Sequence, residues 1–152
     1  MKMRWLAVVL VAGVTGLPHV ATSGAQDAVP AVTVYKSATC GCCSQWIEHM
    51  RSHGFSVKSM DVEDVTAIKN QYGVPASAGS CHTALVGGYV VEGHVPAADV
   101  KRLLTEKPKV VGIAVPGMPA GSPGMEVPSG RVDPYDVVSF NKAGQISVFE
   151  KH

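Results

Sequence analysis

The chain has 152 residues, and its 13 Lys and Arg against 12 Asp and Glu give a formal net charge of +1 with histidine neutral. This near-balance excludes the strongly basic surface by which most nucleic-acid-binding proteins hold phosphate, so we expect no nucleic-acid partner. A chain of this length is expected to form one domain with a modest hydrophobic core.

The first 25 residues have the features of a secretory signal peptide. A short basic start precedes the apolar run Trp5–Leu17, which is shorter than the about 20 residues that a membrane-spanning helix needs. Ser23-Gly24-Ala25 supplies small residues for cleavage, which leaves Gln26 as the first mature residue. An uncleaved membrane anchor is the alternative. We expect a periplasmic protein in which residues 26–152 form a single domain, without membrane association after cleavage.

Strands and helices alternate through the first part of the mature chain. Patterns of apolar residues predict a strand at 32–35, a helix from Cys42 to His53, a strand at 55–62, a short helix starting at Asp61 or Glu63, a strand at 81–86, a turn at Gly87-Gly88, a strand at 89–95 and a helix between Pro96 and Pro108. The order β-α-β-α-β-β-α predicts an α/β protein with a thioredoxin-like fold. Trp46 and Met50 are expected in its core.

The C-terminal part has a different composition. Residues 112–115 predict a short strand, and 116–125 form a loop rich in Pro, Gly and Met. Two strand patterns, at 136–140 and 146–149, flank Lys142-Ala143-Gly144 and predict a β-hairpin. We therefore expect this loop and hairpin as additions to the thioredoxin-like domain.

Four cysteines are the candidate functional residues. Cys40, Cys42 and Cys43 lie within four residues, and Cys81 stands at the start of a predicted strand. In an exported chain, four cysteines can form two disulfides. A disulfide stabilises mainly by closing a long loop, however, and so tight a cluster closes almost nothing. The spacing therefore favours a chemical role.

The predicted helix start favours thiolate chemistry. Unpaired backbone N–H groups and the helix dipole stabilise a thiolate there, which makes Cys40 and Cys43 a redox-capable pair. Cys42 adds a sulfur that such a pair does not need. In a thioredoxin-like fold the loop before the third strand packs on the Cys-x-x-Cys turn, so we expect Cys81 to join the other three sulfurs.

This sulfur cluster predicts a soft-metal site. Thiolates favour Cu(I), zinc and iron–sulfur clusters. The Cys-x-Cys-Cys spacing is unlike the separated ligand pairs of structural zinc sites and narrower than iron–sulfur motifs. Because four thiolates around one Cu(I) would carry a large negative charge that is costly to desolvate, we expect several Cu(I) ions bound by Cys40, Cys42, Cys43 and Cys81.

Other soft or nitrogen donors are weaker candidates. His82 is a candidate ligand, although alternation along a strand would point it away from the thiols. Met118 and Met125 lie in the loop and are candidate thioether ligands, with ordinary packing as the alternative. His94 is expected to have a structural role or to support a metal-binding side chain. His49 and His53 are expected on a solvated face of the helix.

With these residues in view, the chain resembles the CopG family of small exported copper-resistance proteins, which are distinct from the repressors of the same name. The matching stretches cover nearly all of the mature chain and include Val34-Tyr35-Lys36-Ser37, Cys40-Gly41-Cys42-Cys43, Tyr72-Gly73-Val74-Pro75, Ser80-Cys81-His82-Thr83, Glu92-Gly93-His94-Val95-Pro96, Val115-Pro116-Gly117-Met118-Pro119, Gly121-Ser122-Pro123-Gly124-Met125-Glu126 and Asp133-Pro134-Tyr135-Asp136-Val137. The resemblance implies a thioredoxin-like fold, copper bound through the four cysteines and a copper redox role. Ala38 stands where such proteins often have proline, which affects only the rigidity of that loop.

Three functions are consistent with the sequence. The leading hypothesis is a periplasmic copper-binding protein for copper tolerance that interconverts Cu(II) and Cu(I), and whether it acts as a copper oxidoreductase stays open. Its expected partners are copper ions, with other periplasmic copper-handling proteins as candidates, and it is expected to be a monomer. The alternatives are a metal-free thiol–disulfide oxidoreductase and a structural protein with two inert disulfides.

Overall fold

The computed structural model describes residues 30–152, so the predicted signal peptide lies outside the described residues. The elements are the strands β1 (Val32–Lys36), β2 (Val57–Asp61), β3 (Thr83–Val86), β4 (Tyr89–Glu92), β5 (Gly112–Ala114), β6 (Asp136–Phe140) and β7 (Ile146–Lys151), the helices α1 (Gly41–Ser52), α2 (Val65–Gln71) and α3 (Ala97–Glu106), and the short 3₁₀ helix η1 (Ala76–Ala78). In this part of the chain, no helix is long and apolar enough to cross a membrane.

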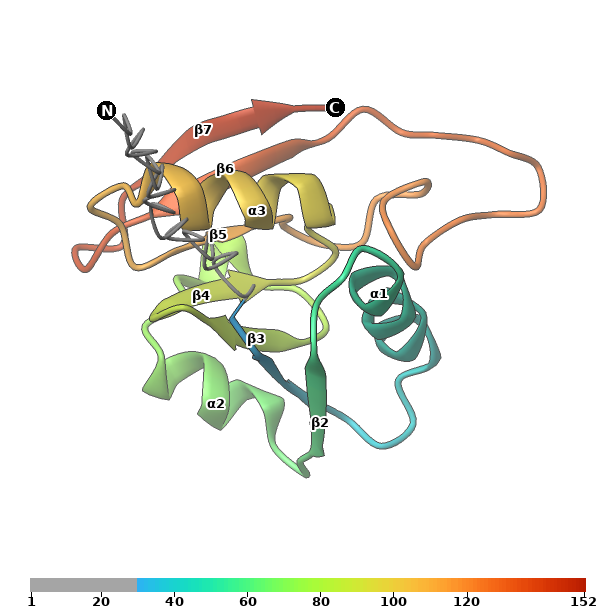
Figure 1. The fold of residues 1–152 in the computed structure, drawn as a ribbon, viewed down its shortest axis with the longest axis horizontal. Coiled ribbons are helices and arrows are strands. Elements are labelled where there is room, and N and C mark those ends of the chain that lie inside the picture. The colour runs from blue at the N-terminus through green and yellow to red at the C-terminus, as the bar shows by residue number, and fades with distance from the viewer. Residues whose placement is uncertain (1–29) are drawn as a thin grey trace, which may run out of the picture.

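All seven strands join one mixed sheet in the order β2-β1-β3-β4-β5-β6-β7. Neighbours pair in parallel at β1–β2 and β4–β5, and the remaining pairs are antiparallel. Helices α1 and α3 contribute to the larger apolar cluster, on one face of the sheet. The smaller cluster includes Tyr72, which directly follows α2, and Ala78, which lies in η1. Figure 1 shows α2 apart from the other two helices. The α/β class is therefore confirmed.

The predicted order β-α-β-α-β-β-α is the observed one, and the C-terminal hairpin is present as β6 and β7. Two boundaries differ in a way that affects the candidate site. Strand β3 begins at Thr83, so the predicted strand start at Cys81 is wrong, and β4 ends at Glu92, three residues before the predicted end. Cys81 and His94 therefore lie outside the sheet, in the segments that precede β3 and follow β4.

Helix α1 forms because its apolar residues recur on one side. Cys43, Trp46, Ile47 and Met50 are buried, and the predicted core positions of Trp46 and Met50 are confirmed. The indole Nε1 of Trp46 donates a hydrogen bond to the carbonyl of Val95 at 2.8 Å. This bond joins α1 to the loop that follows β4, and so holds the two segments of the candidate site together.

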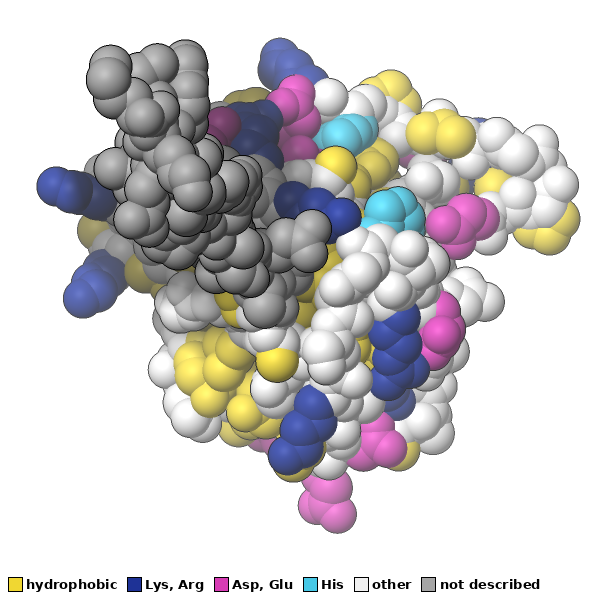
Figure 2. All heavy atoms as spheres, in the orientation of Figure 1, with side chains coloured by type: hydrophobic (Ala, Val, Ile, Leu, Met, Phe, Trp, Pro, Cys, Tyr) yellow, Lys and Arg dark blue, Asp and Glu magenta, His cyan; other side chains and the backbone are white. Residues whose placement is uncertain are grey.

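The Pro/Gly/Met-rich loop crosses the amino-terminal half of α1. Gly124 has φ +84°, and a Cβ atom there would lie 2.7 Å from the backbone nitrogen of Trp46 and 2.8 Å from the carbonyl oxygen of Cys42. Only glycine permits both this backbone conformation and so close an approach. Figure 1 shows the orange chain between β5 and β6 passing α1 before it extends outward. Figure 2, in the same orientation, shows that acidic and basic side chains are interspersed on the face toward the viewer.

Candidate metal centre

Three of the four cysteines occupy the cap and first turn of α1. Cys40 is the residue that precedes the helix, and Cys42 and Cys43 follow within its first turn. A disulfide joins Cys40 to Cys43, whose Cα atoms are 5.4 Å apart. Cys42 keeps a free thiol, and its Sγ lies 3.6 Å from Sγ of Cys40. The structure therefore shows the predicted redox-capable pair in its oxidised form.

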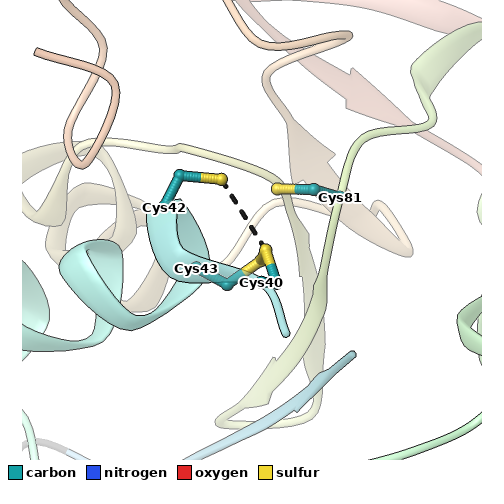
Figure 3. A group of neighbouring side chains, drawn as sticks. All are labelled: Cys40, Cys42, Cys43 and Cys81. Atoms are coloured by element: carbon teal, nitrogen blue, oxygen red, sulfur yellow. Dashed lines mark hydrogen bonds between the residues drawn. A yellow bond between two sulfur atoms is a disulfide. The ribbon is translucent and has the colours of Figure 1, made fainter. Parts of the chain in front are cut away.

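The sheet register brings Cys81 to this helix. Strands β1 and β3 are antiparallel, with Tyr35 paired with Thr83, so the chain leaving β1 and the chain entering β3 lie at the same end of the sheet. The first leads to Cys40 and the second contains Cys81. The four sulfur atoms all lie within 4.8 Å of one another. Figure 3 shows the Cys81 side chain directed at those of Cys40 and Cys42.

The thiol of Cys81 is an unusually weak acid, with a raised pKa. Burial and the neighbouring Cys42 thiol raise the pKa of Cys81 to about 12, although a hydrogen bond from Ser80 acts in the opposite direction. The Cys81 thiol is consequently protonated at neutral pH. A metal ion that binds this sulfur must displace the proton, because the thiolate is the form that binds metal.

The expectation that His82 points away from the thiols is wrong. Cys81 and His82 precede β3, so the alternation of side chains in a strand does not apply to them. Nδ1 of His82 lies 3.3 Å from Sγ of Cys81, and Nε2 of His94 lies 3.0 Å from the same sulfur. These three residues form a second group that could hold a metal ion, and it shares Cys81 with the four cysteines.

Both imidazole rings are completely buried. Burial lowers the pKa of His82 well below its usual range and also lowers the pKa of His94. Near pH 7 both rings are therefore neutral, and each has one nitrogen with a free lone pair.

Sequence reasoning did not place His94 beside Cys81, although the signal was present. The Gly87-Gly88 turn predicts a hairpin in which residues equally distant from the turn face each other. The observed register pairs Thr83 with Glu92, and the same register continued two residues beyond the strands places Cys81 opposite His94.

The candidate methionines and the two histidines of α1 and its C-terminal end differ in solvent exposure. Met118 is 53% exposed and Met125 is half-buried, and a ligand role for either stays a prediction. His53 is exposed, as expected. His49 is half-buried and its Nε2 accepts a hydrogen bond from the backbone nitrogen of Ala97 at 3.1 Å, so the expected solvated face is wrong for His49.

A buried carboxylate anchors the loop that carries Cys81. Glu92 is fully buried, and its Oε1 accepts hydrogen bonds from the backbone nitrogen of Ser80 at 2.7 Å and from Nζ of Lys69 at 2.5 Å. Its Oε2 accepts from Oγ1 of Thr83 at 2.7 Å. These contacts hold the chain on both sides of Cys81, and no sequence motif indicated this role for Glu92.

Known proteins are similar to this chain in family and in fold. A family model described as a protein of unknown function, DUF411, matches residues 78–125. Two solved structures, described as forms 2 and 1 of the copper resistance protein CopG, are 48% identical in sequence, with TM-scores of 0.77 and 0.76. Each match covers 82% of this chain and 98% of the solved chain. No curated protein matches.

Proposed function

The chain belongs to the family of the copper-resistance protein CopG, and from that premise we propose that it binds Cu(I) through Cys40, Cys42, Cys43 and Cys81. The observation that carries the proposal is the grouping of these four sulfurs within 4.8 Å of one another. Several Cu(I) ions bridged by shared thiolates offset the negative charge that four thiolates would otherwise bring into a partly buried site.

The disulfide supports a redox part of the function. Reduction of the Cys40–Cys43 disulfide to two thiols takes two electrons and two protons, and oxidation of two Cu(I) ions to Cu(II) supplies the two electrons. In the reverse direction, the dithiol reduces two Cu(II) ions to Cu(I) and releases two protons. We propose that the protein interconverts copper states in this way, and that the four-sulfur site binds copper only after the disulfide has been reduced.

Copper titration under anaerobic conditions tests this function. The fully reduced protein is titrated with Cu(I) in competition with a chelator of known affinity. We expect more than one Cu(I) per chain, and we expect Cys81→Ser to lower both the number bound and the affinity. Gln45→Ala, an exposed change in the same helix, serves as the control and should bind as the unchanged protein does. Binding of less than one ion per chain, or binding unaffected by Cys81→Ser, would overturn the proposal.

A metal-free thiol–disulfide oxidoreductase is the second candidate, because the Cys40–Cys43 disulfide at the start of α1 is the arrangement that such enzymes use. This function requires only those two cysteines. Insulin reduction at an unchanged rate in Cys42→Ser, together with failure to bind Cu(I), would favour it over the copper function. The alternative of two inert disulfides is not the observed arrangement, since Cys42 and Cys81 are free.

We propose that the chain is exported to the periplasm after removal of residues 1–25 and that residues 26–152 act as one monomeric domain. Copper ions are its proposed ligands, and other periplasmic copper-handling proteins are its candidate partners. In that compartment an oxidising environment would keep the Cys40–Cys43 pair as a disulfide until a reductant or Cu(I) reduces it.

A further inference from the structure

The two edges of the sheet are built differently. Strand β2 forms one edge and β7 the other, so each has a single neighbouring strand among the residues that the structure describes. Along β2, Lys58 and Asp61 place charged side chains at exposed positions, and such charges keep a free edge from pairing with another chain. The stretch Ile146–Phe149 of β7 contains neither a charged residue nor a proline. Strand β7 is therefore the edge that lacks this protection.

Two apolar side chains are exposed on this edge. Ile146 is 44% exposed and Val148 is 54% exposed. They pair with Phe140 and Val138 of β6, which are buried in the smaller apolar cluster. Because directly opposed residues of paired strands project to the same face, Ile146 and Val148 continue the face of that cluster to the margin of the sheet. These two residues are referred to below as the β7 ledge.

A hollow with two lysines adjoins the start of β7. It has a volume of about 490 Å³ and lies between the α3–β5 connection and the β6–β7 turn. Its lining residues are Lys109, Val110, Val111, Asn141, Lys142 and Ala143. Both lysines are exposed, and within residues 30–152 neither belongs to an ion pair. Lysine or arginine side chains project at the left of Figure 2, on the side where Figure 1 draws the turn between β6 and β7.

The chemistry of the hollow suits a carboxylate. The side chain of Asn141 is engaged within the turn, because its Oδ1 accepts hydrogen bonds from the backbone nitrogens of Ala143 and Gln145 and its Nδ2 donates to Oε1 of Gln145. The ammonium groups of Lys109 and Lys142 are therefore the remaining side-chain donors. A carboxylate accepts charge-assisted hydrogen bonds from such groups, and its hydrocarbon stem can rest on the valine and alanine lining.

We propose that β7 is a docking edge for an extended segment of a partner protein, which pairs with β7 as an eighth strand and places an acidic side chain between Lys109 and Lys142. The free backbone N–H and C=O groups of β7 supply the hydrogen bonds of this pairing. Every second side chain of the added strand faces the β7 ledge. The partner segment therefore has apolar residues at alternate positions and Asp or Glu at the end that reaches the hollow.

Charge and backbone chemistry favour this partner over two others. Antiparallel pairing of β7 with β7 of a second copy would bring Lys151, at the end of one strand, toward Lys109 and Lys142, at the start of the other, and like charges oppose that contact. An anionic membrane would attract the lysines but would leave the row of backbone groups on β7 without strand partners. An acidic, extended peptide segment satisfies both the lysines and the backbone.

This edge lies away from the candidate metal centre. Ile146 pairs with Phe140 and Phe140 with Gly112, and the register continues through β4 and β3 to Thr33, near the start of β1. The cysteines of α1 follow the opposite end of β1. A partner bound at β7 therefore leaves the centre accessible, and the docking proposal does not depend on the copper function.

A peptide titration of the isotope-labelled mature chain tests the proposal. The probe is a peptide of alternating threonine and valine with two glutamates at each end, so that it can present an acidic end to the hollow in either strand direction. In nuclear magnetic resonance spectra we expect its addition to shift the backbone amide signals of Ile146 and Val148. The same peptide with lysines in place of the glutamates should bind at least about fivefold more weakly, because like charges oppose its approach.

Variants at exposed positions separate the two parts of the docking edge. We expect Val148→Lys, which places a charge on the ledge, and the double variant Lys109→Glu with Lys142→Glu each to weaken binding of the acidic peptide at least about fivefold. Lys58→Glu, on the opposite edge of the sheet, is the matched control and should bind as the unchanged protein does.

Three results would overturn the proposal. The first is the absence of shifts at Ile146 and Val148 at a peptide concentration on the order of 1 mM, a measurement that needs no variant to fold. The second is equal binding of the acidic and basic peptides. The third is binding by the unchanged protein to phosphatidylglycerol vesicles, or to a second copy in sedimentation, with no response of β7 to the acidic peptide.

Discussion

At the scale of single residues, Cys81 differs from the other cysteines because its partly buried thiol lies beside that of Cys42. Burial and the neighbouring Cys42 thiol raise its pKa to about 12, so the thiol is neutral near pH 7. The folded chain binds this proton more tightly than the unfolded chain does. The stability that results is fully present below the unfolded thiol's pKa and is lost as the pH rises through the folded pKa of about 12.

Alkylation kinetics should show this shift. In the metal-free protein with the Cys40–Cys43 disulfide, we expect iodoacetamide to modify Cys81 slowly at pH 8, with a rate that rises about tenfold per pH unit up to at least pH ~10.5, because only the thiolate reacts. Mass spectrometry of the Cys81 peptide measures the rate. Cys42→Ser removes the neighbouring thiol and should move the profile to lower pH. A plateau near pH ~9, as for an ordinary cysteine, would contradict the expectation.

At the scale of elements, helix α1 is held between the sheet and the loop that precedes β6. Its inner side packs on the core through Trp46 and Met50, and Gly124 of the loop lies directly against its backbone. The carbonyl of the adjacent Pro123 binds His94. The loop therefore covers the start of α1 and also orients a residue of the candidate centre, so a change in its packing should affect both stability and the site.

Gly124→Ala is expected to destabilise the protein by two separate effects. The positive φ costs roughly 1–2 kcal/mol for a residue with a side chain, and the clash of the added methyl with α1 costs about 1–3 kcal/mol more. Gly130→Ala is the matched control, because Gly130 also has positive φ, at +69°, but its Cβ would meet nothing within 4 Å. Urea unfolding measures both. Equal stabilities of the two variants would show that the loop does not pack on α1 as described.

At the scale of the whole molecule, the candidate centre lies where three adjacent strands of the sheet end. The chain leaves β1 toward the cysteines of α1, enters β3 from Cys81 and leaves β4 toward His94. Glu92 ties these segments to α2 on the other side of the sheet through its ion pair with Lys69. The position of Cys81 thus depends on packing across the full thickness of the molecule.

Loss of the Glu92 charge should therefore destabilise the folded protein. We expect Glu92→Gln to lower the free energy of unfolding by about 1.5–3 kcal/mol, because it removes charge-assisted hydrogen bonds and leaves Lys69, whose side chain is only 16% exposed, without its partner. The exposed ion pair of Glu48 with Arg51 supplies the control, since Glu48→Gln should change stability by less than about 0.5 kcal/mol. Denaturant unfolding compares the two. A Glu92→Gln variant as stable as the control would refute the anchoring role.

The sequence by itself determined the features that depend on neighbouring residues. Local apolar spacing was enough to predict α1 with its cysteines at the start, the order of strands and helices, and the C-terminal hairpin. The tertiary structure alone decided how His82 turns, that His94 contacts Cys81, that Glu92 anchors the Cys81 loop and that Gly124 lies on α1. Each of these depends on contacts between segments far apart in the chain. Strand register and side-chain packing set such contacts, and a pattern within one segment does not contain them.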